Sequence, residues 1–182
     1  MSYVAIDEAV REQVAPVPAH THEHVPHQKL VIIAWSGDLD KVWPQMILAT
    51  TGAAMGMDTT VFFTFWGLFA LVKGDVRITG DDWMQKMMAM MDRPGIDHLK
   101  LGKMNFAGAG PAMMKHLARE HEVASPGELL ETAVALGVKL VPCQMTMDLL
   151  GLRREDMIDG LSEPAGATTM LMEAQDAVTL FI

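Results

Sequence analysis

Residues 30–35 read LVIIAW, and residues 36–40, which follow directly, read SGDLD. A continuous run of apolar, largely β-branched residues is typical of a strand buried on both faces, as in a parallel sheet covered by helices. The SGDLD segment then turns the chain and offers side chains that cap a helix, and residues 41–55 have the composition of a buried helix. A buried strand followed by a buried helix predicts an α/β fold.

Strand and helix signals continue to alternate along the rest of the chain. Further strands are predicted at residues 58–65, 103–107, 138–142 and 177–182. Further helices are predicted at residues 81–92, 111–121, 125–136, 144–150 and 165–176, and a capping-box pattern, SPGE, starts the one at 125. Five strands separated by helices predict one three-layer α/β/α domain with a parallel five-stranded sheet.

Residues 1–28 differ in character from the rest. Prolines interrupt any periodic pattern there, and the stretch contains four histidines: His20, His22, His24 and His27. We expect a flexible arm at 1–28 and a globular domain at 29–182. Neutral imidazoles two residues apart can chelate a transition metal, but a solvated tract has the same composition, so we predict no metal site.

Composition limits the partners and the location. Asp and Glu total 23 against 14 Lys and Arg, a formal charge of −9 at pH 7, whereas nucleic-acid binding needs a basic surface. The single cysteine excludes an internal disulfide, and the N-terminus lacks the pattern of a secretory signal, so we expect a cytoplasmic protein. Residues 42–72 are apolar, but Gly52, Gly56 and Asp58 divide them, so we expect no stable membrane insertion.

In a parallel sheet, ligands bind outside the carboxyl ends of the strands. Cys143 directly follows the predicted strand at 138–142 and precedes the predicted helix at 144–150. The positive end of that helix favours a thiolate, which predicts a nucleophile or a sulfur carrier. A lone cysteine is also often a small core residue, and this alternative stays open.

Other motifs carry less information. The GAG string at 108–110 lacks the final glycine of a dinucleotide fingerprint, so a tight turn explains it and no cofactor is predicted. No histidine lies near Cys143 in the sequence, so we predict no Cys–His hydrolase. Several of the 17 methionines fall at helical spacing in residues 84–91, which indicates core filling or an oligomer surface.

Four strings, taken in order, resemble a known family. They are SGDLDK at 36–41, GAAMG at 52–56, VFFTFWGL at 61–68 and CQMTMDLLG at 143–151. Together they are similar to the DsrE/DsrF-like sulfur-relay proteins, especially the stand-alone type. The resemblance covers residue 29 to the C-terminus and leaves the arm outside it.

The resemblance implies a homo-oligomer with a cysteine that accepts sulfur as a persulfide or thiosulfonate and passes it on. Cys143 is at the matching position. The chain would then be a sulfur carrier or sulfurtransferase, with rhodanese-type and TusA-type proteins as donor or acceptor. Some relatives have a second cysteine, and this chain has none, so release of sulfur would depend on an external thiol.

We predict a pocket around Cys143 in which backbone N–H groups hold an anionic sulfur and an aromatic pair excludes water. Its predicted wall residues are Ser36, Gly37, Asp38, Phe65, Trp66, Gly67, Asn105, Gly108, Gly110, Met145 and Thr146. The alternative function is a non-catalytic small-ligand-binding or assembly protein of the same fold, in which the cysteine is inert.

Overall fold

The computed structural model describes residues 28–75, 95–103 and 105–182. Four strands in these residues form one parallel sheet in the order β3-β2-β1-β4. The strands are β1 (Lys29–Ala34), β2 (Asp58–Phe63), β3 (Lys139–Pro142) and β4 (Ala177–Phe181). The central strand β1 pairs with β2 from Lys29↔Asp58 onward and with β4 from Lys29↔Ala177 onward. The sequence prediction of a parallel α/β sheet is therefore confirmed.

The predicted number of five strands is wrong for the described residues, because residues 103 and 105–107 form no strand. Phe106–Gly108 is a 3-10 turn (η3), and the segment before it is bound to the start of a helix instead. Leu39 N donates to Lys100 O (2.8 Å), and Gly102 N donates to the Asp40 carboxylate (3.0 Å). The edge of β2 that a further strand could use is occupied by β3.

One face of the sheet is covered by two long helices, α2 (Leu39–Ala54) and α5 (Pro126–Ala135). Alternate strand residues, such as Leu30, Ile32 and Val61, point to this face and form most of the core. Helix α2 begins two residues before the predicted start. Its N-cap residue, Asp38, makes no side-chain cap bond because its carboxylate accepts from Lys41.

The capping box predicted for α5 is confirmed. Ser125 Oγ accepts from Glu128 N (3.3 Å), and the Glu128 carboxylate accepts from Ser125 N (2.7 Å). The hydrogen bonds that Ser125 N and Ser125 Oγ donate to the Glu128 carboxylate hold the pKa of this carboxyl below its ordinary value. Because the carboxylate form is the one stabilised, this contribution is present above the unfolded-state pKa and is lost as the pH falls through the folded-state pKa.

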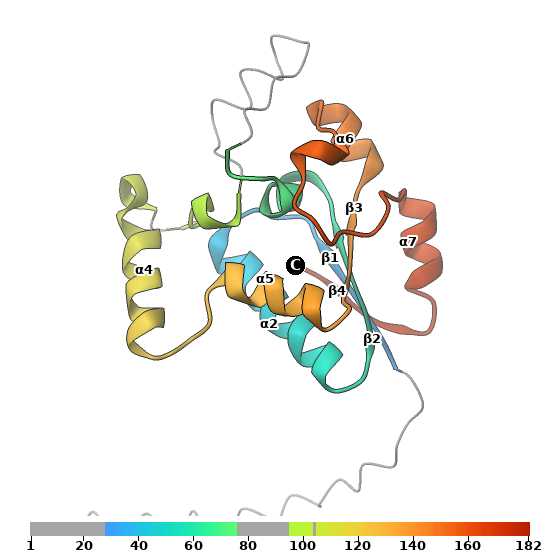
Figure 1. Ribbon diagram of the computed structural model, residues 1–182, viewed down its shortest axis with the longest axis horizontal. Coiled ribbons are helices and arrows are strands. Elements are labelled where there is room, and N and C mark those ends of the chain that lie inside the picture. The colour runs from blue at the N-terminus through green and yellow to red at the C-terminus, as the bar shows by residue number, and fades with distance from the viewer. Residues whose placement is uncertain (1–27, 76–94, 104) are drawn as a thin grey trace, which may run out of the picture.

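The opposite face of the sheet carries α7 (Ala167–Glu173), which is shorter than the predicted helix at 165–176. Figure 1 shows α7 on one side of the strands and α2, α5 and α4 (Ala109–Glu120) on the other. A smaller cluster forms under α7 and contains Val31, Phe62, Val141, Cys143 and Met170. The two helical layers therefore differ in size, because the face that carries α7 is covered by a shorter helix than the face that carries α2 and α5.

The remaining described elements lie at the ends of the strands or at the surface. They are α6 (Gln144–Leu150), which matches its predicted bounds, and the 3-10 helices η1 (Phe65–Leu71), η2 (Ile96–His98) and η4 (Arg154–Asp156). No helix in the described part of the chain combines the length and the apolar character needed to cross a membrane. The predicted arm with its histidines and the predicted helix at 81–92 lie outside the described residues, apart from Gln28.

Candidate functional site

Cys143 is the N-cap residue of α6 and lies at the carboxyl end of β3, as predicted. Its backbone is bound on both sides: Cys143 N donates to Phe63 O of β2 (2.9 Å), and the residue forms a parallel bridge with Ala165. The residue is only 3% exposed. Its side chain belongs to the apolar cluster under α7, so the thiol is buried among apolar side chains rather than open to solvent.

Thr146, in the first turn of α6, joins the end of β3 to the end of β2. Its hydroxyl lies 3.1 Å from Thr64 Oγ1 and accepts a hydrogen bond from Phe65 N (3.2 Å). This contact helps to hold Phe65 in the left-handed region, at φ 47°, which a non-glycine residue rarely adopts. Strand β2 therefore ends two residues earlier than predicted, and 3-10 helix η1 begins.

Two glycines allow the end of β2 to pack directly on the end of β1. A Cβ atom on Gly37 would lie 2.5 Å from Trp66 O, and one on Gly67 would lie 2.2 Å from Ala34 O. Gly67 N also donates to Trp35 O (3.2 Å). Since the strand ends meet backbone to backbone, the ends of β3, β2 and β1 form one continuous edge.

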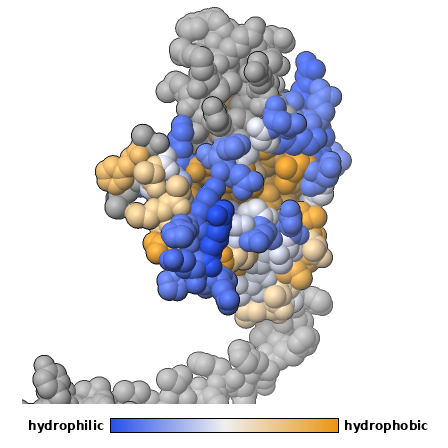
Figure 2. All heavy atoms as spheres, turned by 60° about the vertical axis from the view of Figure 1, so that its left-hand side comes forward, coloured by the Kyte–Doolittle hydropathy of each residue, from blue (hydrophilic) through white to orange (hydrophobic). Residues whose placement is uncertain are grey.

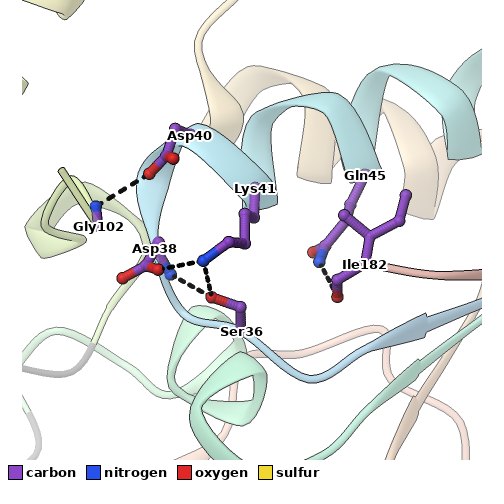
Figure 3. A network of polar contacts seen from close by, with 7 residues as sticks. All are labelled: Ser36, Asp38, Asp40, Lys41, Gln45, Gly102 and Ile182. Carbon is purple, nitrogen blue, oxygen red and sulfur yellow. Dashed lines mark hydrogen bonds and ion pairs between the residues drawn. The ribbon is translucent and has the colours of Figure 1, made fainter.

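A polar network lies at the end of β1 (Figure 3). Lys41 Nζ donates to Asp38 Oδ2 (2.5 Å) and to Ser36 Oγ (3.3 Å), and Asp38 N donates to Ser36 Oγ (3.2 Å). The hydrogen bond to Asp38 raises the pKa of Lys41 above its ordinary value. Lys41 Nζ also lies 5.5 Å from the centre of the Trp35 ring, within cation–π distance.

The sequence patterns did not indicate Lys41, Trp35 or Thr64 as site residues. The signal for Lys41 was its position three residues after Asp38 at the start of a helix, where side chains at this spacing are neighbours. No sequence signal indicated Thr64, because its partner Thr146 is 82 residues away.

Among the predicted wall residues, Ser36, Gly37, Asp38, Phe65, Trp66, Gly67, Met145 and Thr146 belong to the three joined strand ends. Ser36 and Thr146 are buried. The aromatic pair, Phe65 and Trp66, remains about half exposed, and Trp66 stacks on Phe69 with the ring centres 5.9 Å apart.

Asn105, Gly108 and Gly110 are not part of this edge. They lie at the start of α4, which Figure 1 shows well away from α6. Gly108 N and Gly110 N both donate to Asn105 O, so these residues form a turn. The Asn105 side-chain oxygen is buried and has no hydrogen-bond partner among the described residues.

Two surface hollows lie beside α4. One of about 390 Å³ lies between α2 and α4, with walls that include Trp43, Ile47 and Leu117, and a smaller one of about 180 Å³ includes Gly110. Figure 2 turns the α4 side of the molecule toward the viewer. On this face, hydrophobic residues reach the surface beside hydrophilic ones. In the described parts of the chain, no group of three or more His, Cys, Asp or Glu residues is placed to hold a metal ion.

Thr146→Val is expected to destabilise the protein by about 1 kcal/mol, because valine cannot accept the hydrogen bond from Phe65 N. Urea unfolding followed by circular dichroism measures the difference. The control is Thr132→Val, since the Thr132 hydroxyl only donates to an exposed carbonyl of α5, and we expect it to change stability by less than about 0.5 kcal/mol. Equal effects of the two substitutions would contradict a structural role for the Thr146 contact.

Comparison with known proteins agrees with this fold. The profile of the DsrE/DsrF/DrsH-like family matches residues 26–181. The chain is 40% identical over 156 residues to the uncharacterised protein YrkE of Bacillus subtilis, covering 85% of this chain and 97% of YrkE. It is 37% identical over 158 residues to the sulfur carrier protein DsrE2 of Allochromatium vinosum, covering 85% of this chain and 98% of that protein.

Among solved structures, the chain is similar to the YchN protein of Escherichia coli, with a TM-score of 0.53 at 16% identity. The similarity covers 85% of this chain and 99% of YchN. At this identity the likeness concerns the fold alone. Because the family profile spans nearly all of residues 29–182, and two relatives share more than a third of their residues with the chain, this protein belongs to the DsrE/DsrF/DrsH-like family.

Proposed function

We propose that this protein is a sulfur carrier in a sulfur relay, which holds sulfane sulfur on Cys143 and passes it to the thiol of a partner. The observation that carries the proposal is the position of Cys143. It is the only thiol of the chain and lies between the end of β3 and the start of α6. The 37% identity to a protein named as a sulfur carrier supports the same role.

The loading step needs a donor that carries a sulfane sulfur, such as a persulfide on another protein or an inorganic polysulfide. The Cys143 thiolate attacks the outer sulfur of the donor, a new S–S bond forms, and the S–S bond of the donor breaks as its thiolate leaves. With tetrathionate as donor, the leaving group is thiosulfate and the adduct is a thiosulfonate. Neither reaction needs an additional oxidant or reductant.

The unloading step needs a thiol from outside the chain. The thiolate of the acceptor attacks the outer sulfur of the Cys143 persulfide, and Cys143 leaves as a thiolate. Since the chain has one cysteine, it cannot release sulfur by forming an internal disulfide. The acceptor thiol must therefore belong to another molecule. We propose that the donor and the acceptor are other proteins of the relay, of the rhodanese and TusA types, and that transfer takes place in the cytoplasm. We also propose that the carrier self-associates.

A second candidate function is a binding or assembly protein in which the cysteine is inert. The observation that favours it is the 3% exposure of Cys143, within a cluster of apolar side chains. In this case no sulfur donor would modify the folded protein.

Intact-mass measurement distinguishes the two functions. The folded protein is incubated with polysulfide, thiosulfate or tetrathionate, and its mass is measured before and after treatment with dithiothreitol. We expect a reducible adduct of sulfur or thiosulfonate on the parent protein and none on Cys143→Ser, which contains no thiol. Leu149→Ala serves as the matched control, since it truncates an exposed side chain on α6 outside the predicted pocket wall and leaves the thiol in place.

Failure of every donor to modify the folded parent protein would overturn the sulfur-carrier proposal and favour the binding protein. An adduct that formed equally on Cys143→Ser would show that the sulfur is not held by the cysteine.

A further inference from the structure

The cluster that contains Cys143 is covered by one short helix in the described part of the chain. Helix α7 has seven residues, and of these only Met170 is buried. Helix α2, on the other face of the sheet, buries eight residues. Figure 1 shows the strands between α7 and the layer of α2 and α5. Within the helix, a single buried side chain therefore holds α7 against the sheet.

Both ends of the α7 segment are attached to the sheet. Before the helix, Ala165 forms a parallel bridge with Cys143, and Ala165 N donates to Pro142 O (3.0 Å). After the helix, Ala177 begins β4, which pairs with β1. Residues 166–176 therefore connect two fixed points across one face of the sheet. A segment attached in this way can move away from the sheet while both attachments stay intact.

An additional sulfur on Cys143 needs space in the cluster under α7. The members of this cluster, Val31, Phe62, Val141, Cys143 and Met170, are each at most 7% exposed. Protein interiors are packed about as densely as organic crystals, so an extra heavy atom forces neighbouring side chains to move. A persulfide adds one sulfur atom, and a thiosulfonate adds a larger group. Loading of the cysteine therefore requires a rearrangement of its surroundings.

Met170 is the least restrained member of this cluster. Val31, Phe62 and Val141 belong to three adjacent strands and are held by the ladders of β1 with β2 and of β2 with β3. Met170 lies on a helix outside these ladders, and its unbranched side chain has three rotatable bonds. An added sulfur is therefore expected to displace Met170, and α7 with it, before it displaces a strand.

We propose that α7 is a cover over Cys143, held closed by Met170 in the empty carrier and displaced when the cysteine bears an additional sulfur. Loading takes place during transient openings of the cover. Afterwards the displaced cover leaves the outer sulfur accessible to the thiol of an acceptor, so the loaded and the empty protein have different surfaces. This inference rests on the proposed function, but the cover is tested with a reagent that donates no sulfane sulfur.

Methyl methanethiosulfonate provides this test, because it needs no partner protein. The Cys143 thiolate attacks the sulfur of its methylthio group, an S–S bond forms, and methanesulfinate leaves. Intact mass follows the reaction of the full chain. We expect Met170→Ala to react at least about 10-fold faster than the parent, because it removes the side chain that holds the cover closed. The matched control is Met172→Ala, the same change at a position of α7 that is 65% exposed, which should react as the parent does.

Amide hydrogen exchange of the methylthio adduct measures the displacement itself. In the parent protein, a peptide that covers residues 167–174 should exchange at least about 10-fold faster with the adduct than without it, whereas residues 126–135 of α5 should not change. Met170→Leu keeps a similar side-chain volume and should react and exchange as the parent does. Circular dichroism establishes that each variant is folded. If Met170→Ala does not fold, Met170→Val replaces it, with an expected acceleration of at least about 3-fold.

Three results would overturn the proposal. The parental reaction rate in folded Met170→Ala would show that this side chain does not control access to the thiol. Unchanged exchange of residues 167–174 in the adduct would show that the cluster accepts the added group without moving α7. Equal acceleration of exchange in α5 and α7 would show that the whole domain opens.

These results leave the sulfur-carrier proposal standing, because a polysulfide adduct on the parent protein tests it separately. In the opposite case, Met170→Ala reacts faster with methyl methanethiosulfonate, but neither polysulfide nor tetrathionate modifies the parent or the variant. That outcome would support the cover and overturn the sulfur carrier.

Discussion

Cys143 in the folded protein is expected to react with a small aromatic disulfide reagent at least about 100-fold more slowly than in the urea-unfolded chain. Cys143 is 3% exposed and belongs to the apolar cluster that also contains Met170 of α7. The reagent can reach the thiol only after a local opening of the structure, and a 100-fold slower reaction corresponds to a free energy of about 2.7 kcal/mol for that opening. The rate is measured by the absorbance of the released thiol.

The dependence of this rate on urea distinguishes a sulfur carrier from an inert cysteine. Helix α7 covers one face of the sheet and has only seven residues, so its displacement would expose little new surface. Reaction through such a local opening should be nearly independent of urea below the unfolding transition. A rate that rises with the full slope of global unfolding would instead indicate a thiol that is accessible only in the unfolded chain.

Gly67→Ala is expected to destabilise the protein by about 3 kcal/mol, or to prevent folding, because the new Cβ atom would lie 2.2 Å from Ala34 O. The neighbouring atom belongs to the central strand and cannot move without disturbing the ladder of β1. The two hydrogen bonds that Gly67 N donates, to Trp35 O and Thr64 O, would be displaced as well. Urea unfolding measures the loss.

The matched control for this substitution is Gly127→Ala. A Cβ atom on Gly127 would meet only side-chain atoms at 3.8 Å, and the residue lies in the first turn of α5. Alanine there should be neutral or stabilise by up to about 1 kcal/mol. A loss of less than about 1 kcal/mol for Gly67→Ala would contradict the close contact between the ends of β1 and β2.

The two glycines at the strand ends also explain why the candidate site could be predicted only in part. The sequence placed Gly37 and Gly67 at the ends of two buried strands, and both are there. Which backbone atoms they would approach depended on the twist and register of the sheet, because Gly37 meets Trp66 and Gly67 meets Ala34. Local patterns contain no information about such a contact.

The incorrect prediction of a strand at residues 103–107 has a similar origin. A short apolar stretch before a glycine turn is compatible with a strand or with a 3-10 turn. Hydrogen bonds from Leu39 N to Lys100 O and from Gly102 N to Asp40 hold the preceding segment against α2, and these partners lie about 60 residues apart in the chain. Tertiary contacts therefore decided the local structure.

The sequence by itself determined the parallel sheet, the capping box of α5, and the position of Cys143 between a strand and a helix. These features depend on apolar runs, capping residues and turn residues within about ten positions of one another. The tertiary structure alone decided that the thiol is buried under α7, that Thr146 joins two strand ends, and that β4 follows β1 at the end of the described sheet. Burial and edge position depend on which strands become neighbours, and that order follows from packing of the whole sheet rather than from any segment of it.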